Sequence, residues 1–170
     1  GIDIILQAVA LLRQREIEVV FAHIGGLRSN TLEQQQYADS LKQLAVELGV
    51  EANVVWLGRR NDVQDILPMA NVYVHPSRSE GLGSVLLEAS VAGLPLVGSR
   101  VGGIPEIVQH QVNGLLVESD NAEQLADAIE QVLTSKKNYR EQARKMVYQH
   151  FDQAKQSQKL LNMYGLTKVK

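Results

Sequence analysis

The chain has 170 residues, of which 45% are hydrophobic and 21% are charged, and its formal net charge is -2. These values are typical of one globular domain, and they exclude a disordered or low-complexity chain. The near-neutral charge gives no sign of nucleic-acid binding or of a basic membrane-binding surface. The chain has no cysteine, which excludes disulfides, zinc–thiolate sites and thiol catalysis. With neither a signal peptide nor an apolar run of about 18 residues, a cytoplasmic protein is expected.

Hydrophobic periodicity predicts alternating helices and strands along the chain. Helices are expected at 3–15, 32–48, 62–69, 84–92, 104–109 and 121–133, with one or two more over 137–163. Strands are expected at 18–24, 53–57, 71–75, 95–99 and 114–118. Short strands separated by helices predict an α/β, Rossmann-like fold, in which one parallel sheet has helices on both faces.

Glycines follow the predicted strands at several points. Gly25-Gly26 follows the first strand, Gly58 the second, Gly81 and Gly83 the third, and Gly102-Gly103 the fourth. The carboxyl ends of parallel strands meet at one edge of the sheet, where ligands bind in such folds. Glycine lets the backbone approach a ligand closely, and its amides can bind phosphate. Tight turns alone would also explain the glycines, and both interpretations stay open here.

The segment from Ser79 to Ala89 carries the most specific pattern, because Glu80 precedes two glycines and Glu88 follows eight residues later. A helix starting near Ser84 would direct the free amides of its first turn at the sheet edge, where they suit an anion. A carboxylate beside such a site suits vicinal hydroxyls better than phosphate. The pattern therefore fits a nucleoside-diphosphate sugar, although a solvated helix position is the favoured interpretation of Glu88 taken alone.

An ordered series of motifs resembles the C-terminal, donor-binding half of a retaining family 4 glycosyltransferase (glycosyl transferases group 1) with the two-domain GT-B fold. The matching segments lie at 1–12, 54–58, 67–77, 80–88, 92–97, 101–108 and 113–117. Each segment is a weak signal by itself, but their order along almost the whole chain is specific. The chain departs from the family pattern at two positions. It has Leu82 where the family usually has Phe, and Ser90 where the family often has Met.

The resemblance implies a role for each of the two glutamates, Glu80 and Glu88. Glu80, together with the amides of residues 81–84, would hold the hydroxyls of the donor sugar and the distal phosphate. Glu80 would be the catalytic residue as a sugar clamp, and not as a covalent nucleophile. Glu88 would accept hydrogen bonds from the ribose diol. The donor-binding residues implied in this way are Glu80, Gly81, Leu82, Gly83, Ser84, Glu88, Gly58, Arg59, Gly102 and Gly103.

The other matched loops receive roles in the same way. Gly58 and Arg59 would lie beside the base, and Gly102-Gly103 would line the pocket near the sugar. A solvated surface position is an equally good interpretation of Arg59. Arg78 and Arg100 could contact phosphate, but solvated loop arginines are the favoured interpretation of both.

The resemblance also implies parts of the family that this chain does not contain. In the family, several elements come before the position that corresponds to Gly1. They are a whole acceptor domain, a strand, a glycine loop and a basic pair of Arg and Lys. We therefore expect residues 1–170 to form a single nucleotide-sugar-binding domain that lacks its first, central strand, with C-terminal helices over 137–170. Alone, the chain is expected to be inactive. Any peripheral contact with the inner face of a membrane would come through the absent half.

The expected activity is transfer of a hexosyl group from a nucleoside-diphosphate sugar to a glycan, lipid or small-molecule acceptor, with retention at the anomeric carbon. A nucleotide-sugar epimerase of the same fold and a non-catalytic nucleotide-sugar-binding module are the alternatives. No metal or cofactor is expected, because the chain has no Asp-x-Asp motif and its four histidines lack metal-like pairing. The dinucleotide fingerprint of a dehydrogenase and the Gly-x-Ser-x-Gly elbow of an acyl hydrolase are absent as well.

Overall fold

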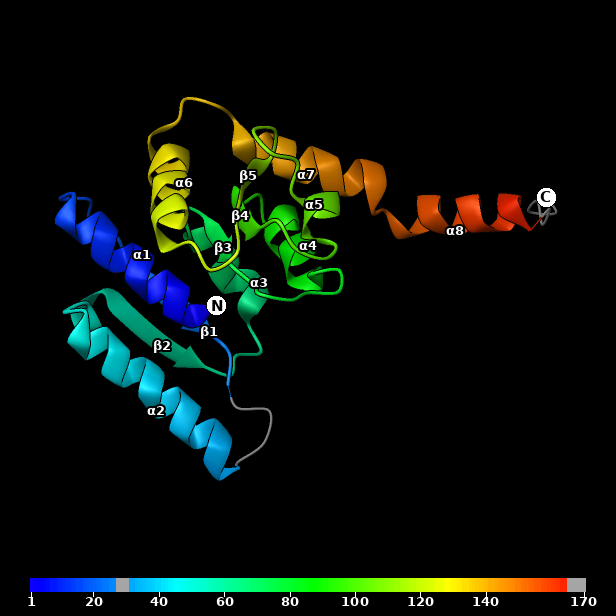
Figure 1. Ribbon diagram of the computed structural model, residues 1–170. Helices are drawn as coiled ribbons and strands as arrows, with labels where there is room; N and C mark the ends of the chain where they lie inside the picture. Colours follow the sequence, from blue (N-terminus) through cyan, green and yellow to red (C-terminus); the bar gives the residue numbers. More distant parts are fainter. Residues whose placement is uncertain (27–30, 165–170) are drawn as a thin grey trace.

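A computed structural model describes residues 1–26 and 31–164 (Figure 1). The strands are β1 (Phe21–Ile24), β2 (Val54–Gly58), β3 (Tyr73–His75), β4 (Leu96–Ser99) and β5 (Gly114–Val117). The helices are α1 (Ile2–Gln14), α2 (Leu32–Glu47), α3 (Val63–Ile66), α4 (Ser84–Val91), α5 (Ile104–Ile107), α6 (Ala122–Thr134), α7 (Tyr139–His150) and α8 (Gln153–Met163). Every predicted element is confirmed, with ends that differ by a few residues. The predicted C-terminal segment beyond residue 164 lies outside the described residues.

Two predicted helices are divided in the structure. The region 62–69 forms α3 and then a 3-10 turn at Leu67–Met69, because Pro68 stands near the start of that turn and cannot donate a backbone hydrogen bond to α3. The C-terminal region forms α7 and α8, which are separated at Asp152. The side chain of Asp152 accepts a hydrogen bond from the amide of Lys155 and thereby starts a new helix.

All strand pairings are parallel, as predicted, but the strands form two sheets and not one. One sheet pairs β1 with β2, and the other has the order β3-β4-β5. Within the described residues, β1 and β3 do not pair with each other. Each of these two strands therefore has one edge without a strand partner in that part of the chain.

Side chains of β4 and β5 alternate between two cores. Val97, Leu115 and Val117 belong to the core that includes buried residues of α1 and α6. Leu96 and Leu116 belong to a second core with residues of α4, α5 and α7. Because successive side chains of a strand point to opposite faces, this sheet has helices on both faces, as predicted.

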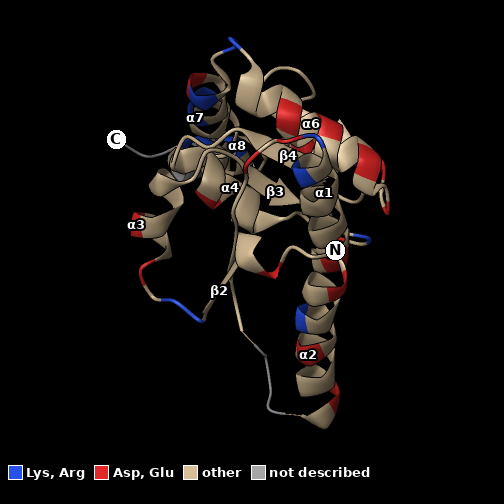
Figure 2. Ribbon diagram, turned by 90° about the vertical axis from the view of Figure 1, so that its left-hand side faces the viewer, with Lys and Arg blue, Asp and Glu red and all other residues tan. Residues whose placement is uncertain are grey.

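Helix α1 lies between α2 and α6 and connects the two sheets (Figure 1). Seven of its residues are buried. At its carboxyl end, Arg13 donates a hydrogen bond to the Gly49 carbonyl after α2. Arg15 pairs with Asp127 and Glu130, at 2.8 and 3.0 Å, on the acidic face of α6 that Figure 2 shows in red. In the part of the chain that the structure describes, no helix is long and apolar enough to cross a bilayer.

Candidate functional site

The loop between β3 and α4 places the amino end of α4 at the carboxyl edge of the second sheet. Gly83 caps α4 in a left-handed conformation, with φ 77°, and it is buried against Leu86. Glycine adopts this conformation without the steric cost that a Cβ would impose. Leu82 and Ser84 are exposed on either side of it. The predicted start of a helix near Ser84 is therefore confirmed, and its first turn opens toward the loop.

Glu80 is held in this loop by two hydrogen bonds. Its Oε2 lies 2.9 Å from Nε2 of His75 at the end of β3, and its Oε1 accepts a hydrogen bond from the amide of Gly81 at 3.0 Å. The contact with His75 is the main reason why the pKa of Glu80 lies below its ordinary value, although partial burial opposes the shift. An ionised carboxylate only accepts hydrogen bonds, so Nε2 of His75 carries the proton. The result is an oriented, negatively charged carboxylate before the α4 terminus.

Glu88 lies one turn into α4 and is exposed. Beneath it, burial raises the pKa of Tyr73 to about 12, and the negative charges of Glu88 and then Glu80 add to this shift. Both carboxylates therefore lie close enough to the Tyr73 phenol to raise its pKa. The sequence predicted the two glutamates as site residues but gave no role to Tyr73 and His75, although both lie in the matched segment 67–77.

The loop after β4 packs directly against the loop that carries Glu80. Gly102 has φ 51°, and a Cβ at this position would lie only 1.8 Å from the carbonyl oxygen of Glu80. The amide of Gly103 donates a hydrogen bond to the carbonyl oxygen of Gly81 at 2.6 Å. The structure thus brings Gly102-Gly103 together with Glu80 and Gly81. That these glycines line a sugar pocket stays a prediction.

The loops of the first sheet form a separate pair. The amide of Gly25, after β1, donates to the carbonyl of Gly58, after β2, at 2.9 Å. Gly58 and Arg59 are exposed. Among the described residues, no hydrogen bond or ion pair joins them to Glu80 or Glu88. Contacts within the chain therefore do not test whether Gly58 and Arg59 lie beside a base, and this position stays a prediction.

Arg78 differs from its interpretation as a solvated arginine. Its side chain is 47% exposed, but it pairs with Asp3 and with Asp120, which lie 75 and 42 residues away in sequence. Because its partners are so distant in sequence, no local pattern could have predicted them. Arg100 is half exposed and lies 3.4 Å from Glu118.

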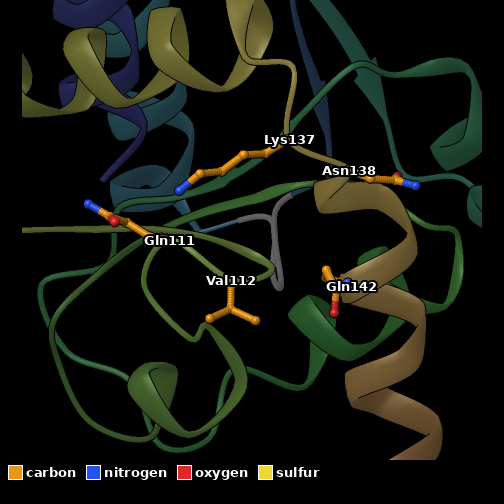
Figure 3. A pocket seen from close by; sticks show the side chains of 5 residues that line it. All are labelled: Gln111, Val112, Lys137, Asn138 and Gln142. Carbon is orange, nitrogen blue, oxygen red and sulfur yellow. The ribbon is translucent and has the colours of Figure 1, made fainter.

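A shallow hollow of about 320 Å³ lies away from these loops (Figure 3). Its lining residues come from the turn before β5 and from the segment around the start of α7. Five residues line it, and none of them was predicted as a site residue: Gln111, Val112, Lys137, Asn138 and Gln142. Residues 1–26 and 31–164 contain no group of three or more histidine, aspartate or glutamate residues that could hold a metal ion.

A family model described as glycosyl transferases group 1 matches residues 1–150. The chain belongs to this family. It is 37% identical over 128 residues to an N-acetyl-alpha-D-glucosaminyl L-malate synthase of Bacillus anthracis, with 74% of this chain and 32% of the relative covered. It is 38% identical over 136 residues to a D-inositol 3-phosphate glycosyltransferase of Saccharomonospora viridis, with 76% and 31% covered. The chain thus spans about a third of the length of these curated relatives.

Several solved structures share the fold of this chain. HepE of Anabaena, crystallised in complex with UDP, matches with a TM-score of 0.85 and 26% identity over 96% of this chain and 44% of that one. The C-terminal domain of LpcC, a group 1 family protein of Francisella tularensis, matches with a TM-score of 0.73 at 21% identity, over 88% and 78% of the two chains. The GT-B-like architecture of this domain is thereby established.

Proposed function

We propose that the chain is the donor-binding half of a retaining family 4 glycosyltransferase, which moves a hexosyl group from a nucleoside-diphosphate sugar to an acceptor. The observation that carries the proposal is the placement of Glu80. Its carboxylate is ionised, oriented by His75 and the Gly81 amide, and set directly before the amino end of α4. A fixed acceptor beside an anion-binding helix terminus suits a ligand that carries hydroxyls and phosphate together.

In this proposal the two glutamates divide the donor between them. Glu80 accepts hydrogen bonds from the sugar hydroxyls, and the first-turn amides of α4 bind the distal phosphate. Glu88, which is exposed one turn into α4, accepts hydrogen bonds from the ribose diol. The protein then acts by positioning the donor and by stabilising the charge that develops on the diphosphate leaving group. Retention at the anomeric carbon follows from the family resemblance, and no nucleophile is assigned.

The relatives support a nucleotide-sugar donor and leave its base open. HepE was crystallised with UDP and, in a second structure at 26% identity, with UDP and glucose. A Mycobacterium tuberculosis relative, 33% identical over 144 residues, is a GDP-mannose-dependent mannosyltransferase. Because each of these proteins is longer than this chain, we propose that transfer requires an acceptor domain and a central strand from outside residues 1–170.

The test is a transfer assay with the full-length protein that carries this chain, using UDP-, GDP- and ADP-sugars with and without acceptor extracts. Release of free nucleoside diphosphate that depends on acceptor supports the transferase. Conversion of the sugar without its release identifies an epimerase, and binding without any turnover identifies a non-catalytic module. Residues 1–170 assayed alone are expected to transfer no sugar. An ordinary enzymatic rate from them would contradict the requirement for a second domain.

A further inference from the structure

Arg78 joins three segments that are far apart in the sequence. It lies two residues before Glu80, in the loop between β3 and α4. Its Nη1 and Nη2 donate to both carboxylate oxygens of Asp3, at 3.0 and 2.6 Å, in the first turn of α1. Its Nε donates to Asp120 at 2.5 Å, directly before the Asn121 cap of α6. The planar guanidinium matches a carboxylate with two parallel hydrogen bonds, and a lysine could not reproduce this geometry.

The ion pairs of Arg78 add polar links between this loop and α1, where the backbone of Gly1 also packs directly against the Pro76 carbonyl. Glu80 is held by His75 and the Gly81 amide, and the loop rests on Gly102-Gly103. These contacts all come from β3, from the loop after β4, or from residues 76–83, which form the Glu80 loop itself. Only Arg78, among the described hydrogen bonds and ion pairs of residues 76–83, connects this loop to α1 and to the segment before α6.

We propose that Arg78 is a positioning residue, which fixes the Glu80 loop against α1 and α6 and so sets the place of the sugar hydroxyls in the donor site. The inference rests on the proposed function and adds a residue to it. Arg78 acts through Glu80 and is itself bound to two carboxylates. Losing it therefore displaces the sugar clamp but leaves Glu88, which stands on the α4 helix, in place.

Arg15 provides a matched control. It also pairs with two carboxylates, Asp127 and Glu130, and it joins the same α1 to the same α6. It lies at the other end of α1, away from the Glu80 loop. Arg15→Gln thus removes an equivalent link between the two helices without touching the loop.

The experiment measures two quantities in the full-length protein: hydrogen exchange of peptides spanning residues 76–84, and donor kinetics. For Arg78→Gln we expect about tenfold faster exchange and a fall in kcat of about thirtyfold, with the donor KM changed by less than about threefold. A displacement of about 1 Å at a reacting group can cost about a hundredfold in rate. Arg15→Gln should stay within about twofold of wild type in each quantity.

A second variant covers the case in which Arg78→Gln folds poorly. Asp120→Asn keeps the pair with Asp3 and should raise the loop exchange rate and lower kcat in the same direction, by smaller factors. Unchanged exchange in both variants overturns the proposal, and so does an Arg15→Gln variant that reproduces their effects. If the wild-type protein transfers no sugar, the proposed function fails. The exchange rates then test the restraint by Arg78 without the kinetics. Faster exchange in the Arg78 and Asp120 variants, but not in Arg15→Gln, supports the restraint.

Discussion

The two sheets differ in how deeply their strands are buried and in the contacts that the loops after those strands make. In the second sheet, every residue of β4 and β5 is buried, and the loops after β3 and β4 are bonded to each other through Gly81 and Gly103. In the first sheet, both strands are only partly buried, and Val55 of β2 is 43% exposed. Its loops contact each other through Gly25 and Gly58, and Arg59 extends into solvent.

This difference indicates how the two halves are suited to different tasks. The sugar contact proposed for Glu80 would need a rigid support, and the second sheet provides one around this carboxylate. The base contact predicted for Gly58 and Arg59 would need less rigidity, and the first sheet carries both residues on exposed turns. Helix α1 is the element that connects the halves, because it packs on α2 and on α6. The predictions below test this contrast, starting from the second sheet.

Glu80→Ala should have the largest effect, a fall in kcat of about a hundredfold in the full-length protein. A charge-assisted hydrogen bond is worth about 1.5–3 kcal/mol, so losing those to the sugar lowers the rate by one to two powers of ten. The affinity for the nucleoside diphosphate should change little, because the proposed contacts of Glu80 are to the sugar and not to the base or ribose. Glu51→Ala, at an exposed position before β2, is the control. A Glu80→Ala variant with wild-type turnover on its own donor would end this assignment.

Two glycines with similar backbone angles should respond differently to alanine. Gly102 (φ 51°) would place a Cβ 1.8 Å from the Glu80 carbonyl oxygen, whereas Gly58 (φ 65°) has nothing within 4 Å of an added Cβ. Gly58→Ala should cost only the left-handed conformation, about 1 kcal/mol of unfolding free energy. Gly102→Ala adds displacement of a packed loop, for about 3 kcal/mol in total. Urea unfolding of both variants checks this, and equal losses would show that the loops are not tightly packed.

The smallest expected effect concerns the protonation of Glu80. Its hydrogen bond with His75 lowers its pKa below the ordinary 4.5, so this contact stabilises the folded state above that pH and is lost as pH falls through the lowered pKa. His75→Gln should therefore move the pKa of Glu80 upward, toward 4.5. Carbon-13 NMR of the Glu80 carboxyl follows this titration directly. A downward shift, or none, would mean that His75 does not stabilise the ionised form.

Much of the fold could be predicted because it depends on local patterns. Helical spacing of apolar residues predicted α1 and α2, and the start of α4 was expected near Ser84. The division into two sheets could not be predicted from periodicity, because strand pairing is a long-range property. The same limit applies to the site. Glu80 and Glu88 belong to one short motif, whereas the bonds of Arg78 to Asp3 and Asp120 depend on segments that only the folded chain brings together.

The most direct test of the two-carboxylate site is calorimetric titration of the full-length protein with UDP, GDP and ADP, for wild type and Glu88→Gln. We expect one of the three nucleotides to bind the wild-type protein. Its affinity should fall by about one to two powers of ten in the variant, because a charged hydrogen bond to the ribose diol is lost. Failure of all three nucleotides to bind the wild-type protein would contradict the proposed donor site, and equal affinity in Glu88→Gln would contradict the ribose role of Glu88.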